Sequence, residues 1–407
     1  MNEVTKELVP VGRPSFLRQT NASTILKLLR ETGPCSKADL VRASGLSAPT
    51  VTNVVAHLSS VNLIEPIGEG ESSGGRPPDM IRFKADRGCV AAVDIKIGHL
   101  RFLLTDLNGY PLETAEVALP QHSATPEVVC AQIKETLRSL VRKRKQKLEQ
   151  LLALIIGVPA ITNVKDGTVL SVSPLKGWRN VPLRTMLNKE FDCLVLVEND
   201  TNLAAQGERY RGAALAEENF VFITIGESVG AGIFIDGKIY HGSEWSAGEI
   251  GYLRVPRIST RRSTIHEFGQ LEKVLGSSGI LKSWRTKGQS MAPHIAVHHA
   301  EQVLDLAVEG NAHARKILLQ KASILTDAIL NLALILNPGL VLLGGEIGSH
   351  PALLDAVKTL LKGNEFAIAR VALGSLGNSA VLWGAISIAL ESTATLLIQQ
   401  PDTASLK

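Results

Sequence analysis

Short apolar runs at helical spacing, separated by capping and helix-breaking residues, extend from Arg18 to about Val61, after a first stretch that resembles a loose arm. The apolar spacing predicts a helix over residues 18–30, which Gly33 and Pro34 end. A second helix is predicted to start after Ser36, whose hydroxyl can cap it with Asp39 as the partner in a capping box. The chain therefore begins with two helices separated by a tight break.

A third helix follows a short turn. Gly45 ends the second helix, Ser47 can cap the third, and Pro49 lies in its first turn, where a missing N–H costs nothing. The apolar side of this helix runs to about Val61, and two short strand-like runs then flank a Gly/Ser/Pro-rich loop at residues 68–78. Three helices followed by a hairpin indicate a winged helix-turn-helix module.

The surface of this module that is expected to meet DNA is the start of the third helix together with the hairpin loop. The first residues of a recognition helix contact base edges in the major groove, and an arginine on a glycine-rich loop suits a narrow minor groove. The candidate DNA-binding residues are Ser47, Ala48, Pro49, Thr50, Thr52, Asn53 and Arg76. The alternative is a winged helix that binds a protein instead of DNA.

From about residue 89 the pattern changes to alternating strands and helices. Strands are predicted at Cys89–Ile95, Arg101–Leu107, Leu152–Val158, Leu194–Val197, Phe220–Ile225 and Gly232–Ile235, and helices at Pro126–Leu140 and Thr201–Arg211. This alternation predicts an α/β architecture, in which ligands bind where strands end.

Composition narrows the class of protein. A chain of 407 residues suggests two to four domains, and 45% hydrophobic with 20% charged residues excludes disorder. The net charge of +4 permits nucleic-acid binding without arguing for it. The four cysteines form no CxxC pair, which argues against a disulfide scaffold and a clustered zinc site.

Nothing in the sequence points to a membrane or to secretion. The N-terminus has no apolar stretch of the kind found in signal peptides. The uncharged run at residues 328–345 is interrupted by Asn, Pro and Gly, so it predicts a buried helix, a turn and a buried strand. We therefore expect a cytoplasmic protein that does not bind membranes.

Polar residues follow several of the predicted strands. Asp94, Asn199, Asp200 and Glu249 lie where strands end or loops begin, which makes them candidate ligand-binding groups. The other interpretation is that they cap helices or form turns. Spacing alone leaves both interpretations open.

Several segments, in this order, resemble the ROK family of sugar kinases and related transcriptional repressors. They are RQTNASTILKLLRE, GLSAPTVTNVVAHL and GGRPP, then AAVDIKIGHLRFLLTDLNG, IIGVPAITN, VENDTNLAAQGE, ITIGESVGAGIFIDGKIYHGSEWSAGEIGYL and LILNPGLVLLGGEI. The first three resemble the DNA-binding domain of the repressor branch. The resemblance covers the chain from about Arg18 to Leu390.

The family resemblance implies an α/β protein with two parts. Residues 1–85 would form the winged helix-turn-helix, and residues 86–407 an actin-like, ribonuclease H-like sugar-kinase body that senses a ligand and oligomerises. One lobe of this body would comprise about residues 86–200 with a C-terminal return, and the other residues 201–384. A sugar would lie in the cleft between the lobes.

The resemblance also implies which residues contact the sugar. Asp200 matches the family's general base, which takes a proton from a sugar hydroxyl in the kinases. Asn199, Glu249, Tyr252 and Glu272 match its other sugar contacts. Buried acceptors of this kind reject ligands that lack the matching hydroxyl.

One departure from the family pattern concerns zinc. Tyr252 stands in place of the histidine that joins a cysteine cluster on a structural zinc in the family. The matching loop, Arg254–Gln270, contains no cysteine, and Arg257, Arg261, Arg262 and His266 cannot replace the ligand set. We therefore expect no metal site and no cofactor.

A second departure concerns the phosphate loops. Family kinases carry two glycines and a threonine after the Asp that corresponds to Asp94, whereas this chain has Ile95, Lys96, Ile97 and Gly98. Gly226-Glu227-Ser228 replaces the family's Gly-Thr-Gly. A carboxylate about 4 Å from a phosphate charge would cost about 4 kcal/mol at an effective dielectric constant near 20. We therefore expect no kinase activity and no catalytic residue, although Asp200 is retained.

The leading hypothesis is a DNA-binding transcriptional regulator, a repressor of carbohydrate-utilisation genes, that senses a sugar without phosphorylating it. It would bind a double-stranded DNA operator as a homodimer or homotetramer, and the sugar would change the spacing of two recognition helices. The alternatives are an ATP-dependent sugar kinase with a fused DNA-binding domain and a regulator controlled by a partner protein. The acids of the cleft could also be an inherited packed cluster that binds nothing.

Overall fold

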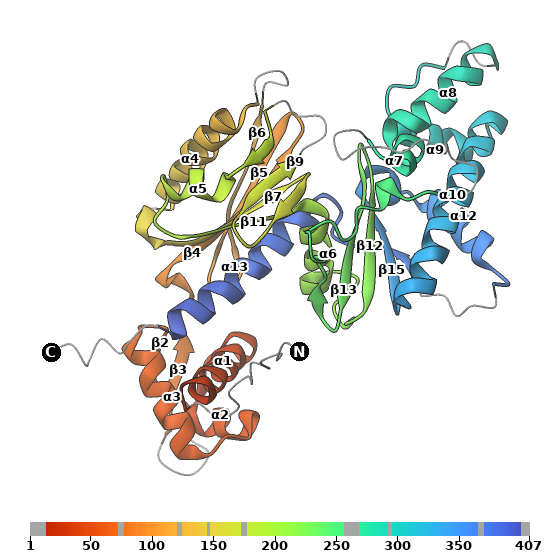
Figure 1. Ribbon diagram of the computed structural model, residues 1–407. Helices are drawn as coiled ribbons and strands as arrows, with labels where there is room; N and C mark the ends of the chain where they lie inside the picture. The colour runs from red at the N-terminus through yellow and green to blue at the C-terminus, as the bar shows by residue number, and fades with distance from the viewer. Residues whose placement is uncertain are drawn as a thin grey trace, which may run out of the picture.

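The computed structural model describes residues 14–71, 77–119, 124–144, 147–171, 177–255, 268–291, 295–364 and 370–399. It has a small N-terminal domain and a larger body with two lobes, each built on its own sheet (Figure 1). The mixed α/β class, the N-terminal winged helix-turn-helix and the two-lobed kinase-like body that the sequence predicted are confirmed.

The N-terminal domain is a winged helix-turn-helix. Its elements are α1 (Pro14–Thr32), β1 (Cys35–Ser36), α2 (Lys37–Ser44), α3 (Ala48–Ser60), β2 (Ile64–Glu69) and β3 (Asp79–Phe83). The Ser36 hydroxyl accepts the Asp39 N–H at 3.2 Å, and the Asp39 carboxylate accepts the Ser36 N–H at 2.9 Å, so the predicted capping box is present. Gly45 ends α2 with a left-handed φ of 68°, as its place in the sequence predicted.

The first lobe of the body contains a five-stranded sheet in the order β11-β7-β4-β5-β6. These strands are β4 (Cys89–Lys96), β5 (His99–Asp106), β6 (Pro111–Ala118), β7 (Leu151–Val158) and β11 (Leu194–Asn199). β11, β7 and β4 run parallel to one another, so their carboxyl ends share one edge. β4 is buried on both faces because α4 (Pro126–Lys143) covers one and α13 (Ala380–Ile398) the other.

Smaller elements complete the first lobe. They are α5 (Leu183–Asn188), a small sheet of β8 (Ile161–Asn163), β9 (Thr168–Ser171) and β10 (Arg179–Val181), and the 3₁₀ turns η1 (Ala85–Arg87) and η2 (Leu148–Gln150). The sequence pattern did not predict β6 or this small sheet.

The second lobe contains a five-stranded sheet in the order β14-β13-β12-β15-β16. Its strands are β12 (Phe220–Ile225), β13 (Val229–Ile235), β14 (Lys238–Ile239), β15 (Leu340–Gly344) and β16 (Arg370–Leu373). Its helices are α7 (Gln270–Leu275), α8 (Ser277–Met291), α9 (Ala300–Val308), α10 (Ala312–Leu336), α11 (Gly345–Gly348) and α12 (Pro351–Leu361), with the 3₁₀ turns η3 (Ile250–Tyr252) and η4 (Gly377–Ser379). β13 starts three residues before the predicted strand.

Two helices, α6 (Asp200–Arg211) and α13, lie between the lobes and pack closely on each other (Figure 1). The close approach requires glycine. A Cβ on Gly384 would lie 1.8 Å from the Leu203 carbonyl oxygen, and a Cβ on Gly207 would lie 2.1 Å from the Ala380 carbonyl oxygen. The two helices are therefore held in close contact along their length of overlap.

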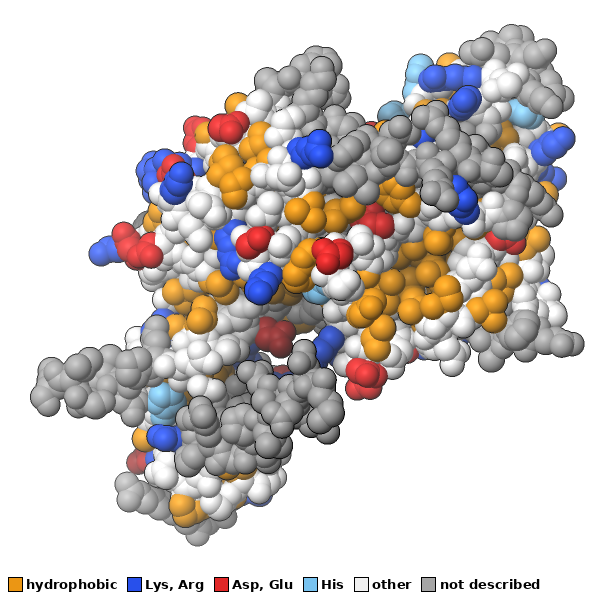
Figure 2. All heavy atoms as spheres, in the orientation of Figure 1, with side chains coloured by type: hydrophobic (Ala, Val, Ile, Leu, Met, Phe, Trp, Pro, Cys, Tyr) orange, Lys and Arg blue, Asp and Glu red, His pale blue; other side chains and the backbone are white. Residues whose placement is uncertain are grey.

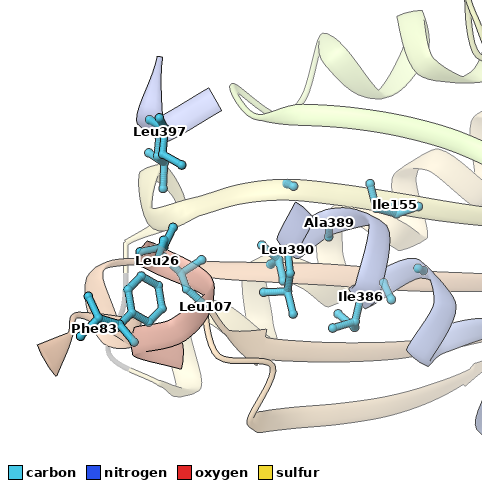
Figure 3. Close-up of a cluster of buried hydrophobic side chains, with 14 of the residues drawn as sticks. Leu26, Phe83, Leu107, Ile155, Ile386, Ala389, Leu390 and Leu397 are labelled. Carbon is cyan, nitrogen blue, oxygen red and sulfur yellow. The ribbon is translucent and has the colours of Figure 1, made fainter. Parts of the chain in front are cut away.

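The far end of α13 packs against the N-terminal domain. Leu390 and Leu397 of α13 lie in one apolar cluster with Leu26 of α1, Phe83 of β3 and Leu107 (Figure 3). We call these five residues the interdomain seam. The His57 ring Nε2 also donates to the Ile398 carbonyl oxygen at 2.9 Å. The N-terminal domain is thus docked on α13.

Two segments of the described chain, Ala312–Leu336 and Gly377–Ile398, are long and apolar enough to cross a membrane. In each segment, 56% of the most apolar 18-residue stretch is buried within the fold. Both helices belong to apolar cores of the fold, which explains their composition. The predicted helix, turn and strand over residues 328–345 are present as the end of α10, Asn337 and β15.

Candidate functional site

A cleft opens between the lobes where β11 meets α6. All five residues predicted to bind sugar line it: Asn199 and Asp200 from the first lobe side, and Glu249, Tyr252 and Glu272 from the second lobe. The parallel register of β11 and β7 brings the end of β11 beside Pro159 and Ala160, which also line the cleft. The fold therefore gathers residues that are far apart in the sequence.

Asn199 serves mainly as the N-cap of α6. Its Oδ1 accepts the backbone N–H groups of Thr201 at 2.9 Å and Asn202 at 3.1 Å, and its Nδ2 donates to the Ala160 carbonyl at 3.1 Å. An amide nitrogen has two hydrogens. One N–H of Asn199 is therefore left to donate into the cleft.

Asp200 faces a lysine across the cleft floor. The Lys96 Nζ lies 3.8 Å from the Asp200 Oδ2, and the Asp200 side chain is 14% exposed. Burial raises the pKa of Asp200, although Lys96 acts in the opposite direction. Burial alone would lower the pKa of Lys96, but Asp94 and Asp200 outweigh it and the pKa is raised. Lys96 is thus a resident cation beside the family's base position.

Glu249 is another acid of the cleft with a perturbed pKa. The structure shows no hydrogen bond to its carboxylate within the described part of the chain. Burial, with Glu272 and Asp200 nearby, raises the pKa of Glu249 to about 7. A carboxylate without a protein partner in a cleft is available to accept a ligand hydroxyl.

Glu272 is held by the backbone. Its Oε1 accepts the Val229 N–H at 3.2 Å, and its Oε2 accepts the Gly269 N–H at 3.0 Å. Burial raises the pKa of Glu272 against these two donors. Each oxygen keeps a second lone pair for a ligand. Tyr252 adds a phenol at the rim of the same cleft.

The phosphate-loop positions differ from a glycine cradle. Asp94 is fully buried and receives a hydrogen bond from the Arg101 guanidinium, while its Oδ1 has no partner. Lys96 projects from the end of β4 toward Asp200. Glu227 and Ser228 are exposed in the turn between β12 and β13. Lys96 and Ser228 thus carry side chains at positions where a glycine loop has only backbone atoms.

Within the described residues, no group of three or more His, Cys, Asp or Glu side chains could hold a metal ion. Residues 256–267 lie outside the described part, and they include Arg257, Arg261, Arg262 and His266. The expectation that this loop holds no zinc therefore stays a prediction.

The start of α3 presents the predicted DNA-binding residues. Ser47, Ala48, Pro49, Thr52 and Asn53 are exposed and Thr50 is partly buried. The Ser47 hydroxyl caps the helix and lies 2.8 Å from the Thr50 hydroxyl, so these two side chains hold each other. Arg76 lies outside the described residues.

Sequence reasoning missed two residues of the site, Glu198 and His241. Their side chains pair at 2.7 Å across the two lobes. Glu198 directly precedes Asn199, which could have singled it out. Nothing in the sequence marks its pairing with a histidine 43 positions later.

The comparison with protein families shows which family the chain belongs to. The ROK family matches residues 90–392, which is well over half of the chain. The chain belongs to the ROK family. The resemblance on which the sequence analysis relied is therefore confirmed.

Relatives of this ROK protein include repressors and kinases. It is 27% identical over 397 residues to a xylose repressor of Bacillus spizizenii, across 94% of this chain and 97% of the repressor. It is 30% identical over 273 residues to a glucokinase of Halalkalibacterium halodurans, across 63% of this chain and 82% of the glucokinase. The repressor match extends over the N-terminal domain, so the chain resembles the repressor branch.

A solved structure gives the same result for the fold. A ROK family transcriptional regulator, a homolog of the Escherichia coli Mlc protein, superimposes with a TM-score of 0.79 at 23% identity. The match covers 94% of this chain and all of the other. The winged-helix domain and the two-lobed body thus occur together in a known ROK regulator fold.

Proposed function

We propose that this ROK protein is a DNA-binding transcriptional repressor of carbohydrate-utilisation genes whose cleft binds a sugar and does not phosphorylate it. The observation that carries the proposal is the combination, in one chain, of an exposed recognition helix and a cleft lined by all five sugar-contact positions. Such a protein acts in the cytoplasm on double-stranded DNA.

The hydrogen-bonding groups of the cleft support a sugar as the ligand. Asp200, Glu249 and Glu272 supply carboxylate acceptors, whereas Asn199 has one amide hydrogen to donate. A ligand that matches this set presents several hydroxyl donors. A phosphorylated sugar would bring further negative charge toward three acids, so a neutral sugar is favoured.

Lys96 supports the absence of phosphoryl transfer. Its ammonium lies 3.8 Å from the carboxylate that would act as the base, and Asp94 and Glu346 also raise its pKa. A phosphate loop needs backbone that approaches the phosphates closely, which glycine allows and a lysine side chain obstructs. A kinase needs this space for ATP, whereas a sensor does not.

The route from the sugar to the DNA runs along two helices. The cleft contains the first residues of α6, α6 packs on α13, and the end of α13 meets the interdomain seam. A sugar that prefers one arrangement of the lobes would shift the population of positions that the winged helix adopts. In a homodimer or homotetramer this changes the spacing of two recognition helices.

One face of the second lobe supports self-association. Hydrophobic side chains gather on the face of this lobe that Figure 2 shows. Exposed apolar patches of this kind mark interaction sites on soluble proteins. Repressors that bind two half-sites need such a contact between copies.

The test is a thermal-shift panel on the purified protein with D-xylose, D-glucose, other neutral hexoses and pentoses, amino sugars and sugar phosphates, each with and without MgATP. A ligand at about 100 times its dissociation constant adds about 2.7 kcal/mol of stability. We expect a shift from a neutral sugar that is indifferent to MgATP. A shift that needs MgATP would favour a kinase, and the absence of any shift would favour control by a partner protein.

A further inference from the structure

Glu198 is a buried acid whose two oxygens are both occupied. It lies at the end of β11, directly before Asn199, with a side chain that is 8% exposed. Its Oε1 accepts the Asn199 backbone N–H at 2.8 Å and the Asn202 Nδ2–H at 3.0 Å. Its Oε2 lies 2.7 Å from the His241 Nε2. The acid is therefore part of the framework that fixes Asn199.

His241 belongs to the other lobe. It follows β14 and begins the loop that carries Glu249. Inside this loop the Ala247 N–H donates to the His241 carbonyl at 3.2 Å, and the Gly248 carbonyl accepts the Ala231 N–H at 2.8 Å. A Cβ on Gly248 would lie 1.9 Å from the Ala231 carbonyl oxygen, so the loop is tightly fitted against β13.

The pair therefore joins the two sides of the cleft. On one side Glu198 is bonded to the backbone of Asn199, and on the other His241 anchors the start of the loop that ends at Glu249. The sugar-contact residues on both sides are thus linked through one contact that does not itself line the cleft.

We propose that His241 is a positioning residue of the cleft: paired with Glu198, it holds the loop of Glu249 against the strand end that carries Asn199 and Asp200. This inference rests on the proposed function, because it concerns how firmly the sugar site is assembled. His241 does not touch the sugar; it acts through the two elements that do.

The charge on the ring makes this link sensitive to pH. The hydrogen bond with Glu198 raises the pKa of His241, against a smaller effect of burial. Glu198 from β11 is the charged group that faces the ring in the described structure, and the Trp245 ring meets it edge-on at 5.9 Å between centroids. Because the pKa is raised in the paired state, pairing is strongest at low pH and weakens as pH rises through the raised value.

The test compares full-length wild type with His241→Gln and Glu198→Gln, and with His350→Asn as the control. His350 also pairs with an acid, Asp305, at 3.2 Å and caps α12, and asparagine preserves the cap. Binding of D-xylose is measured by calorimetry at pH 6 and pH 9. Loss of a charged hydrogen bond predicts a dissociation constant about tenfold higher in either Gln variant at pH 6.

We expect the Gln variants to bind the sugar more weakly than wild type at pH 6, with a smaller difference at pH 9. At pH 9 the two Gln variants should lie closer to wild type, because the pair weakens as the imidazole loses its proton, and the control should match wild type at both values. Glu249 titrates in the same range in every variant, so only the difference from wild type reports His241. An equal loss at both pH values, or no loss at pH 6, would overturn the positioning role.

A second readout needs no sugar. A protonated imidazole quenches a neighbouring tryptophan, so Trp245 should give a fluorescence step with pH, separate from any step of Trp284 beside His313. The Trp245 step should be absent in His241→Gln and move to lower pH in Glu198→Gln. If D-xylose binds to no variant, wild type included, the proposed function fails for that probe. The fluorescence step then decides the inference, and a midpoint that Glu198→Gln leaves unchanged would refute the pair.

Discussion

At the scale of single residues, the cleft concentrates acids whose charges are not balanced by equal numbers of bases. Asp200, Glu249 and Glu272 all have raised pKa values, with burial as the largest cause in each. Lys96 is the base that lies within ion-pair distance of Asp200 in the described structure. Buried acids without hydrogen-bond donors destabilise the empty site, and hydroxyl donors of a ligand would relieve this cost in free energy, as expected of a sensor.

Glu249 gives a prediction whose sign follows from its pKa. The value of about 7 lies above the ordinary 4.5, so ionised Glu249 lowers the stability of the folded protein as pH rises through about 7. Glu249→Gln should therefore melt at the wild-type temperature or higher at pH 8, with a flatter pH profile. Calorimetric or fluorescence melting between pH 5 and pH 9 measures this.

The same substitution has a second expected result in sugar binding. A hydroxyl that donates to Glu249 favours the ionised form, so binding of a neutral sugar at pH 7 releases protons. Titration calorimetry in two buffers of different ionisation enthalpy measures the release. It should be smaller in Glu249→Gln than in wild type, and equal release from both proteins would show that the ligand does not meet this carboxylate.

At the scale of helices and strands, local chemistry predicted much of the structure. Ser36, Asp39 and Gly45 bound α2 as expected because caps and left-handed glycines act within a few residues. The sequence pattern did not predict β6 because it is a half-exposed edge strand whose polar and charged residues leave no continuous apolar run. The Glu198–His241 pair was also beyond prediction, since it depends on how the two lobes meet.

The start of α3 carries the prediction for DNA. Asn53 is exposed near the start of α3 and is proposed to contact a base edge, so Asn53→Ala should weaken specific DNA binding by roughly 1–3 kcal/mol. Ser59→Ala, exposed near the other end of the same helix, is the matched control. Fluorescence anisotropy on a selected duplex measures both. Equal affinity of the two variants would remove Asn53 from the interface.

At the scale of the whole molecule, the winged helix is docked on α13 and so is connected to the cleft between the lobes. This arrangement was not predictable from the sequence, because it brings Leu26 of α1 together with Leu397 near the other end of the chain. The five residues that the family resemblance singled out line one cleft, since the resemblance carries the topology that local patterns lack; their contact with a sugar stays a prediction. The resemblance did not predict that α13 contacts the winged helix.

Substitutions in the interdomain seam should weaken the effect of the sugar on DNA affinity without changing the affinity for the sugar. Leu397 is 5% exposed, whereas its neighbour Leu396 is 47% exposed. Leu397→Ala should destabilise the docking of the winged helix by roughly 2–4 kcal/mol, and Leu396→Ala should have little effect. Sugar affinity should stay unchanged in both variants, because neither residue lines the cleft.

The readout for the seam is the effect of the sugar on DNA affinity, with limited proteolysis between the N-terminal domain and the body as a structural check. The response should shrink in Leu397→Ala and persist in Leu396→Ala. A full response in Leu397→Ala would show that the signal takes another route.

The most direct test is the affinity of the full-length protein for a duplex selected from a random-sequence pool, measured by anisotropy with and without the sugar from the thermal-shift panel. We predict that the sugar changes the affinity, that MgATP has no effect on that change, and that no ADP forms. Affinity should also fall steeply with salt, as phosphate contacts require. Sugar-dependent ADP formation, or a failure to select any duplex, would contradict a sugar-sensing repressor.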